Sequence, residues 1–196
     1  MTQINPLKQF FRAIKLYVPL PSGTTYYDDT IEFNADGEVG IMPMTAKDEM
    51  MIKNPDALLN GEAIVSVINS CVPAIKNPKQ LLSNDIDSLL IAIRHASYGD
   101  DLEVDSQCPK CDAKNKFTIN VTQSLSKMVK LDPEYFVGTQ DGIKIYVKPF
   151  SYNEVVQSLK AQFEQHKLAQ NLSNENLPEE ERLRILQQKI QSMMKN

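Results

Sequence analysis

The sequence lacks tryptophan and has only two histidines, seven glycines and three cysteines among 196 residues. With only His95 and His166 available, it offers little material for a general base or a histidine-rich metal centre. It also contains no glycine-rich phosphate loop, no nucleophile elbow and no helix with paired histidines. We therefore expect that the protein is not an enzyme.

The sequence also lacks long apolar runs and an excess of positive charge. No apolar run approaches the ~20 residues that cross a bilayer, and residues 1–14 do not form the apolar stretch of a secretory signal. The odd number of cysteines is typical of a reducing compartment. A formal net charge of −4 disfavours a protein whose main task is binding the phosphate backbone. These features predict a soluble, cytoplasmic protein with no membrane or nucleic-acid partner.

What the sequence does contain is a normal globular composition, 42% hydrophobic and 23% charged. Its patterns predict an α+β fold that starts with a small β unit. One strand follows Phe11, and two more, over 30–33 and 39–42, are joined by a turn over 34–37 that contains Asp-Gly.

Central helices follow this β unit. Thr45 and Asp48 form a capping box at the start of the first, and apolar residues at helical spacing predict a second over 58–72, which Pro73 ends. A third helix starts at Asn84, and Gly99 is expected to terminate it as a left-handed cap.

A β-hairpin is predicted next, with strands over 102–105 and 117–121 and with Phe117, Ile119 and Val121 facing inward. A further alternating strand over 143–148 completes the compact part. The expected organisation is a mixed core domain over 1–150 and a C-terminal helical extension over 151–196.

The extension is rich in Gln, Glu, Lys and Asn, and it reads as two helices separated by a loop near Asn174. The last helix carries a narrow apolar seam at steps of three and four residues, formed by Leu183, Leu186, Ile190 and Met193. This seam either folds back on the preceding helix as a hairpin or packs between chains. In the second case these residues form a protein interface, and the chain is a homo-oligomer.

Cys108-Pro109-Lys110-Cys111 has the spacing of a zinc knuckle, in which two thiolates bind one side of a tetrahedral ion. The usual second pair of ligands is missing. Cys71 is a remote third candidate, but its helical apolar stripe is more typical of a core residue. The knuckle is therefore a turn that closes the hairpin, a site completed by a second subunit, or a redox-active pair. We expect no cofactor, with zinc at Cys108 and Cys111 as the alternative.

Several segments, taken together and in order, resemble the T4-type bacteriophage baseplate hub family of contractile-tailed phages. They run from Pro43 to Glu49, from Ser70 to Pro73, from Asp85 to Leu90, from Ile93 to Gly99 and from Cys108 to Cys111. The resemblance covers residues from about 18 to 121. His95 departs from it, because members carry an apolar residue at this position.

The resemblance implies a late phage protein that is a structural subunit of the baseplate hub or an assembly factor for it. Its expected partners are other hub and tail proteins, with the tape-measure protein as a further candidate. The expected location is the tail baseplate of the virion, and the host cytoplasm during assembly. Arg94 and Tyr98 are candidate interface residues, although an internal ion pair of Arg94 with Asp100 or Glu103 is the favoured role for the arginine. The alternatives are a chaperone that is absent from the mature virion, a zinc-ribbon module that binds nucleic acid or a transcription complex, and a small redox protein.

Overall fold

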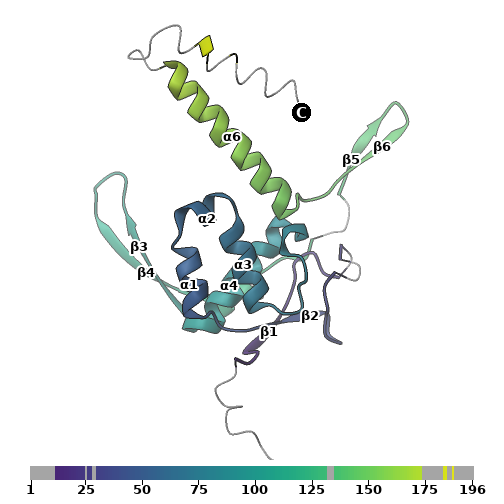
Figure 1. The fold of residues 1–196 in the computed structure, drawn as a ribbon. Coiled ribbons are helices and arrows are strands. Elements are labelled where there is room, and N and C mark those ends of the chain that lie inside the picture. The colour runs from purple at the N-terminus through teal and green to yellow at the C-terminus, as the bar shows by residue number, and fades with distance from the viewer. Residues whose placement is uncertain are drawn as a thin grey trace, which may run out of the picture. The chain divides into compact units, whose positions relative to one another are not determined.

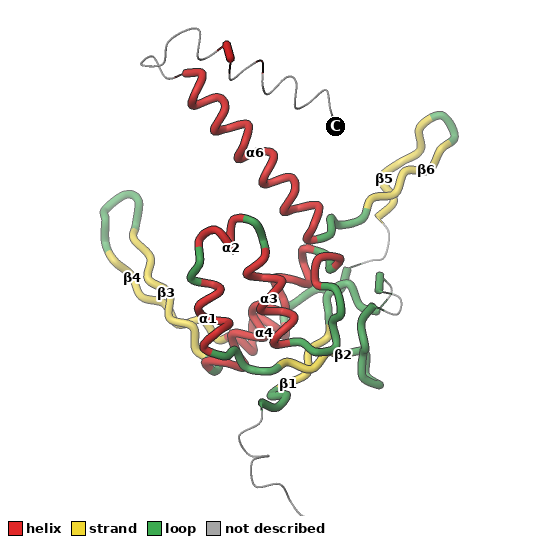
Figure 2. The backbone as a smooth tube through the Cα atoms, in the orientation of Figure 1, coloured by secondary structure: helices red, strands yellow, loops and turns green. Residues whose placement is uncertain are grey.

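A computed structural model describes residues 12–24, 26–27, 30–131, 135–173, 183–184 and 187. As predicted, the fold is α+β, with short antiparallel strand pairs and several helices (Figures 1 and 2). Its backbone groups into two compact units, Met1–Asn153 and Glu154–Asn196. The elements in chain order are β1 (Leu16–Pro19), β2 (Glu38–Ile41), α1 (Ala46–Ile52), α2 (Pro55–Leu59), α3 (Glu62–Cys71), η2 (Pro78–Gln80), α4 (Ser83–Tyr98), β3 (Asp101–Gln107), β4 (Lys114–Asn120), α5 (Val121–Ser126), β5 (Tyr135–Gln140), β6 (Ile143–Val147) and α6 (Tyr152–Ser173).

The β unit near the N-terminus differs from the prediction in its strand pairing. β2 pairs with β1 rather than with residues 30–33. The latter segment instead meets the loop after α3, where Ile31 forms an isolated bridge with Ile75. The turn over 34–37 is present, and the Asn34 side chain accepts hydrogen bonds from the N–H groups of Asp36 and Glu38. The predicted hairpin is wrong because the backbone groups before the turn bond to a distant loop.

α1 begins as predicted. Thr45 is its N-cap, and the reciprocal bonds between Thr45 and Asp48 complete a capping box. The predicted helix over 58–72 is divided in two, because Gly61 adopts a φ of 78° between α2 and α3. α4 ends at Gly99 as predicted, but with φ 87° and ψ −167°, which lies outside the left-handed helical region.

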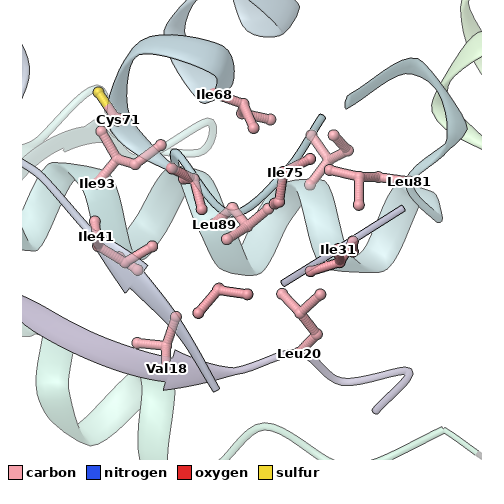
Figure 3. Packing of buried hydrophobic residues seen from close by; sticks show 14 of the residues in the cluster. Val18, Leu20, Ile31, Ile41, Ile68, Cys71, Ile75, Leu81, Leu89 and Ile93 are labelled. Atoms are coloured by element: carbon pink, nitrogen blue, oxygen red, sulfur yellow. The ribbon is translucent and has the colours of Figure 1, made fainter. Parts of the chain in front are cut away.

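The hydrophobic core lies where β1 and β2 meet α3, α4 and the loops around them (Figure 3). α3 and α4 contribute apolar faces at helical spacing, and the strands contribute alternate residues. The cluster consists of Val18, Leu20, Tyr27, Ile31, Val39, Ile41, Val67, Ile68, Cys71, Val72, Ile75, Leu81, Leu82, Ile86, Leu89, Ala92, Ile93 and Ala96. None of these residues comes from the strands β3 to β6.

β3 and β4 form the predicted hairpin, with Asp101 opposite Asn120 at its base and Gln107 opposite Lys114 near its tip. The predicted inward orientation is wrong for Phe117 and Ile119, which are 54% and 42% exposed. Only Val121 is buried, and it already belongs to α5. β6 corresponds to the predicted strand over 143–148, but it pairs with β5, which the sequence did not predict.

α6 begins at Tyr152, close to the predicted start, and the N–H of Tyr152 donates to the carbonyl of Leu81 over 2.7 Å. No helix in the described part of the chain is both long and apolar enough to cross a membrane. The division into domains over 1–150 and 151–196 stays a prediction.

Candidate interaction surfaces

Arg12 connects three segments that are far apart in the sequence. Its guanidinium donates to the carbonyl of Pro43 over 2.5 Å and to the carbonyl and hydroxyl of Ser70 over 2.7 and 2.8 Å. It also donates to the sulfur of Cys71 over 2.9 Å and lies 3.5 Å from the carboxylate of Asp48. Arg12 thereby fixes the chain before β1 against the ends of two helices.

Asp48 is the buried acceptor at the centre of this cluster. It accepts from the backbone and hydroxyl of Thr45, each over 2.8 Å, and from the hydroxyl of Ser70 over 3.0 Å. Burial alone would raise the pKa of Asp48, but these hydrogen bonds and the charge of Arg12 outweigh burial and lower the pKa from its ordinary value. The carboxylate is therefore stabilised in its ionised form.

The C-terminal end of α4 adds contacts to the same region. The N–H of Met44 donates to the hydroxyl of Ser97 over 2.9 Å. Tyr98 is exposed, and its hydroxyl donates to Glu49 over 2.8 Å. Arg94 donates to the carbonyls of Gly99 and Asp101 over 2.7 and 2.5 Å, so it fixes the junction between α4 and β3.

A second buried polar cluster joins the N-terminal segment to the start of α4. Asp85 is fully buried and accepts from the N–H of Ser22 over 3.0 Å, from the Ser22 hydroxyl and from the hydroxyl of Tyr27. The N–H of Leu82 in turn donates to the Tyr27 hydroxyl over 2.8 Å. Burial, followed by the nearby Asp85 charge, raises the pKa of Tyr27 well above its ordinary value. Both polar groups have partners, so their role is to hold the fold.

A groove of about 440 Å³ lies between β1 and α5. His95 reaches its wall, and the Nδ1 atom of His95 is buried without a hydrogen bond, 3.6 Å from the carboxylate of Asp100. The lining is mainly apolar and consists of Leu16, Tyr17, Val18, Pro19, Leu20, Pro21, His95, Thr122, Leu125, Ser126, Met128 and Lys130.

The β3–β4 hairpin has one apolar face. Residues directly opposite each other in an antiparallel pair share a face, and so do alternate residues along a strand. The register therefore places Leu102 with Ile119, and Val104 with Phe117, on one side. We call these four residues the β3–β4 face. Its two β3 residues are half-buried and its two β4 residues are exposed.

The β5–β6 hairpin exposes apolar side chains on both of its sides. Ile143, Ile145 and Val147 alternate along β6 and share one side, which we call the β5–β6 face. They are 69%, 40% and 49% exposed. The opposite side holds the ring pair of Phe136 and Tyr146, with centroids 5.5 Å apart.

The knuckle forms the tip of the β3–β4 hairpin. The N–H of Cys108 donates to the carbonyl of Ala113 over 3.0 Å, and the N–H of Asp112 donates to the carbonyl of Cys108 over 2.9 Å. Cys111 is exposed and Cys108 is half-buried. The backbone N–H groups of Lys110 and Cys111, and then the thiol of Cys111, donate to the Cys108 sulfur and lower the pKa of Cys108.

Comparison with known families gives a match over most of the chain. Residues 17–194 match the family model described as the T4 bacteriophage base plate protein. The chain belongs to this baseplate protein family. No curated protein and no solved structure gave a significant match.

Membership places the protein among the structural components of the phage baseplate, in the tail of the virion. It confirms the family resemblance seen in the sequence. Three of the five segments that carried this resemblance also have a shared physical role in the fold. Residues 43–49, 70–71 and 94–99 meet around Arg12 and Asp48, so the baseplate protein uses them to join α1, α3 and α4.

The predicted site residues lie in different places. Arg94 binds backbone carbonyls rather than Asp100 or Glu103 in the contacts described above, and Tyr98 lies on the surface. Leu183 is helical and 52% exposed. The rest of the seam, which is Leu186, Ile190 and Met193, lies outside the described residues. The interface role of all six residues stays a prediction.

The cysteines do not gather into one site. Cys71 is fully buried on α3 and accepts from Arg12, as expected of a core residue. Across the described residues, no three His, Cys, Asp or Glu side chains are grouped so that they could hold a metal ion. The knuckle thus offers two ligands from one chain.

Sequence reasoning missed Arg12, the Tyr27–Asp85 pair and strand β5. The first two depend on contacts between residues 31 to 59 positions apart, which no local pattern reveals. The third had a local signal, since the run from Tyr135 to Val137 is aromatic and β-branched.

Proposed function

We propose that this baseplate protein is a non-enzymatic structural subunit or assembly factor of the baseplate hub that acts through protein–protein contacts. The observation that carries the proposal is the pair of hairpins with exposed apolar faces. Each leaves large apolar side chains in water: the β3–β4 hairpin on one side, opposite a polar side, and the β5–β6 hairpin on both sides. Apolar faces rimmed by polar residues are typical of protein interaction sites.

The low stability of isolated hairpins supports the same proposal. A two-stranded hairpin is at best marginally stable in water on its own, and it gains stability when an apolar face is covered. Ile143 at 69% exposure is more consistent with a face that another subunit covers than with a finished surface. The partners proposed are other hub and tail proteins, with the tape-measure protein among the candidates.

The experiment is co-expression of the tagged chain with sets of tail proteins from the same phage, followed by isolation of complexes. We expect a stable complex with hub proteins that survives size-exclusion chromatography. A chain that binds none of the tail proteins would contradict the proposal. The control is the same tagged chain with the double substitution Ile143→Thr and Ile145→Thr on the β5–β6 face.

A second measurement distinguishes a permanent structural subunit from an assembly factor. Quantitative mass spectrometry of purified virions and of hub intermediates compares the amount of the chain in each. A permanent subunit is present in both at similar ratios to other hub proteins. An assembly chaperone is present in the intermediates and missing from the virions.

A further inference from the structure

We propose that Cys108 and Cys111 of two copies of this chain together bind one zinc ion, which joins the tips of two β3–β4 hairpins. This inference is independent of the hub location and adds a metal and an oligomeric state to the protein. It uses residues for which neither the fold nor the family match provides another role.

The first support is the chemistry of the tip. Zinc in structural sites is bound by four ligands in a tetrahedron, at about 2.3 Å from each thiolate sulfur. The knuckle supplies two sulfurs on one side, and no third ligand is grouped with them among the described residues. Since Cys111 is exposed and Cys108 is half-buried at the tip of the hairpin, the open side of the ion is accessible to another chain. A second copy supplies the same two ligands, which completes a four-thiolate site.

The second support is the conformation of the loop. The Cys108 sulfur accepts hydrogen bonds from the backbone N–H groups of Lys110 and Cys111 and from the Cys111 thiol, so the loop holds the two sulfurs next to each other. Asp112 adopts a φ of 54°, and its N–H closes the loop onto the Cys108 carbonyl over 2.9 Å. Each thiol gives up its proton to the solvent as it binds the ion. The loop of the knuckle therefore has a fixed conformation before a metal ion binds.

The third support is the β3–β4 face directly below the knuckle. If a two-fold axis runs parallel to the hairpins, the two faces pack against each other and both tips lie at the same end. Packed sheets are separated by about 10 Å, a distance that side chains such as Phe117 fill. One arrangement thus covers Phe117 and Ile119 and brings four cysteines together.

The fourth support is charge. A zinc ion with four thiolates carries a net negative charge of two. The tip from Asp105 to Lys116 contains three lysines against two aspartates. Two tips therefore bring a net positive charge that offsets the charge of the metal centre.

The test is native mass spectrometry of the full chain purified with zinc in the buffer, together with zinc analysis by elemental mass spectrometry. We expect a dimer with one zinc ion per two chains that dissociates when a chelator removes the metal. The double variant Cys108→Ser with Cys111→Ser should be a zinc-free monomer. The matched control is Cys71→Ala, which should keep the zinc and the dimer even if the fold is less stable.

A second pair of variants tests the packing of the hairpins. Phe117→Ser should weaken the dimer at least tenfold, whereas Thr118→Ala, on the opposite side of the same strand, should leave it unchanged. Circular dichroism checks that both variants fold. Four outcomes would each overturn the inference: one zinc per monomer, a dimer that survives without zinc, a Cys108–Cys111 disulfide with no zinc uptake under reducing conditions, or zinc bound only when another tail protein is added.

Discussion

The guanidinium of Arg12 lies 3.5 Å from the carboxylate of Asp48, across 36 residues of sequence. This pair is the centre of a cluster in which the chain before β1 is tied to α1 and α3. Together with the contacts from the end of α4, the cluster joins three of the five segments that carry the family resemblance, those over 43–49, 70–71 and 94–99.

Arg12→Ala should lower the free energy of unfolding by about 2 kcal/mol, because it leaves the buried Asp48 without its cation and two carbonyls without donors. Urea unfolding followed by circular dichroism measures the change. Lys15→Ala is the control, since Lys15 is an exposed cation on the same segment, and it should change the value by less than about 0.5 kcal/mol. Equal effects from both variants would mean that the cluster does not stabilise the fold.

The pKa of Asp48 predicts a dependence of stability on pH. Folding lowers this pKa from its ordinary value of 3.8, so the ionised carboxylate stabilises the fold above that pH. The contribution is lost as pH falls through the lowered pKa of the folded state. Asp48→Asn should therefore flatten the loss of stability below about pH 4. Unfolding free energies of the two proteins at several acidic pH values check this, and parallel curves would contradict it.

Tyr27→Phe should cost about 2 kcal/mol, because the buried Leu82 N–H loses its acceptor and Asp85 loses a donor. Tyr17→Phe, at an exposed tyrosine, is the matched control and should be near neutral. The raised pKa of Tyr27 adds a second readout. Stability should fall as pH rises above 10.0, the ordinary value for tyrosine, and this part of the fall should be missing in Tyr27→Phe.

Gly99→Ala should cost about 2 kcal/mol, because φ 87° with ψ −167° is a combination that only glycine adopts readily. The space around Gly99 is open, so the cost comes from the backbone alone. Gly138→Ala is the control: its surroundings are also open and its φ is not positive. Thermal unfolding of both variants separates them, and a neutral Gly99→Ala would show that the α4–β3 junction relaxes.

The parts of the fold that sequence predicted are those with local causes. Thr45 and Asp48 are three residues apart, so their capping box is visible in the sequence and is present in the fold. The pairing of β2 was missed because the segment around Ile31 bonds to Ile75, and no local pattern specifies a partner so far away. β5 was missed because a register shift between Phe136 and Gly138 interrupts its alternation.

The apolar faces of the hairpins also show what sequence patterns cannot predict. Alternation along β6 correctly indicated a strand with one apolar side, but it could not say whether that side meets the chain's own core or another molecule. Ile143 and Ile145 are exposed, so this side of β6 does not pack against the core of the isolated chain. In a protein that assembles with others, regularly spaced apolar residues face either its own core or a partner. The spacing is the same in both cases, so only the fold distinguishes them.

The last prediction tests whether the β5–β6 face meets a partner or the chain's own core. Replacing Ile143 and Ile145 with threonine should change the free energy of unfolding by less than about 0.5 kcal/mol, since both side chains are exposed and threonine suits a strand. The same double variant should nevertheless lose most of its incorporation into baseplate complexes, because the apolar face that a partner covers is gone. Lys144→Thr is the matched control on the opposite side of β6 and should assemble normally. Chemical unfolding and competition with the unmodified chain during tail assembly give the two readouts. Normal incorporation of the double variant would show that this face is not an interface, and a large loss of stability would show that it packs within the chain.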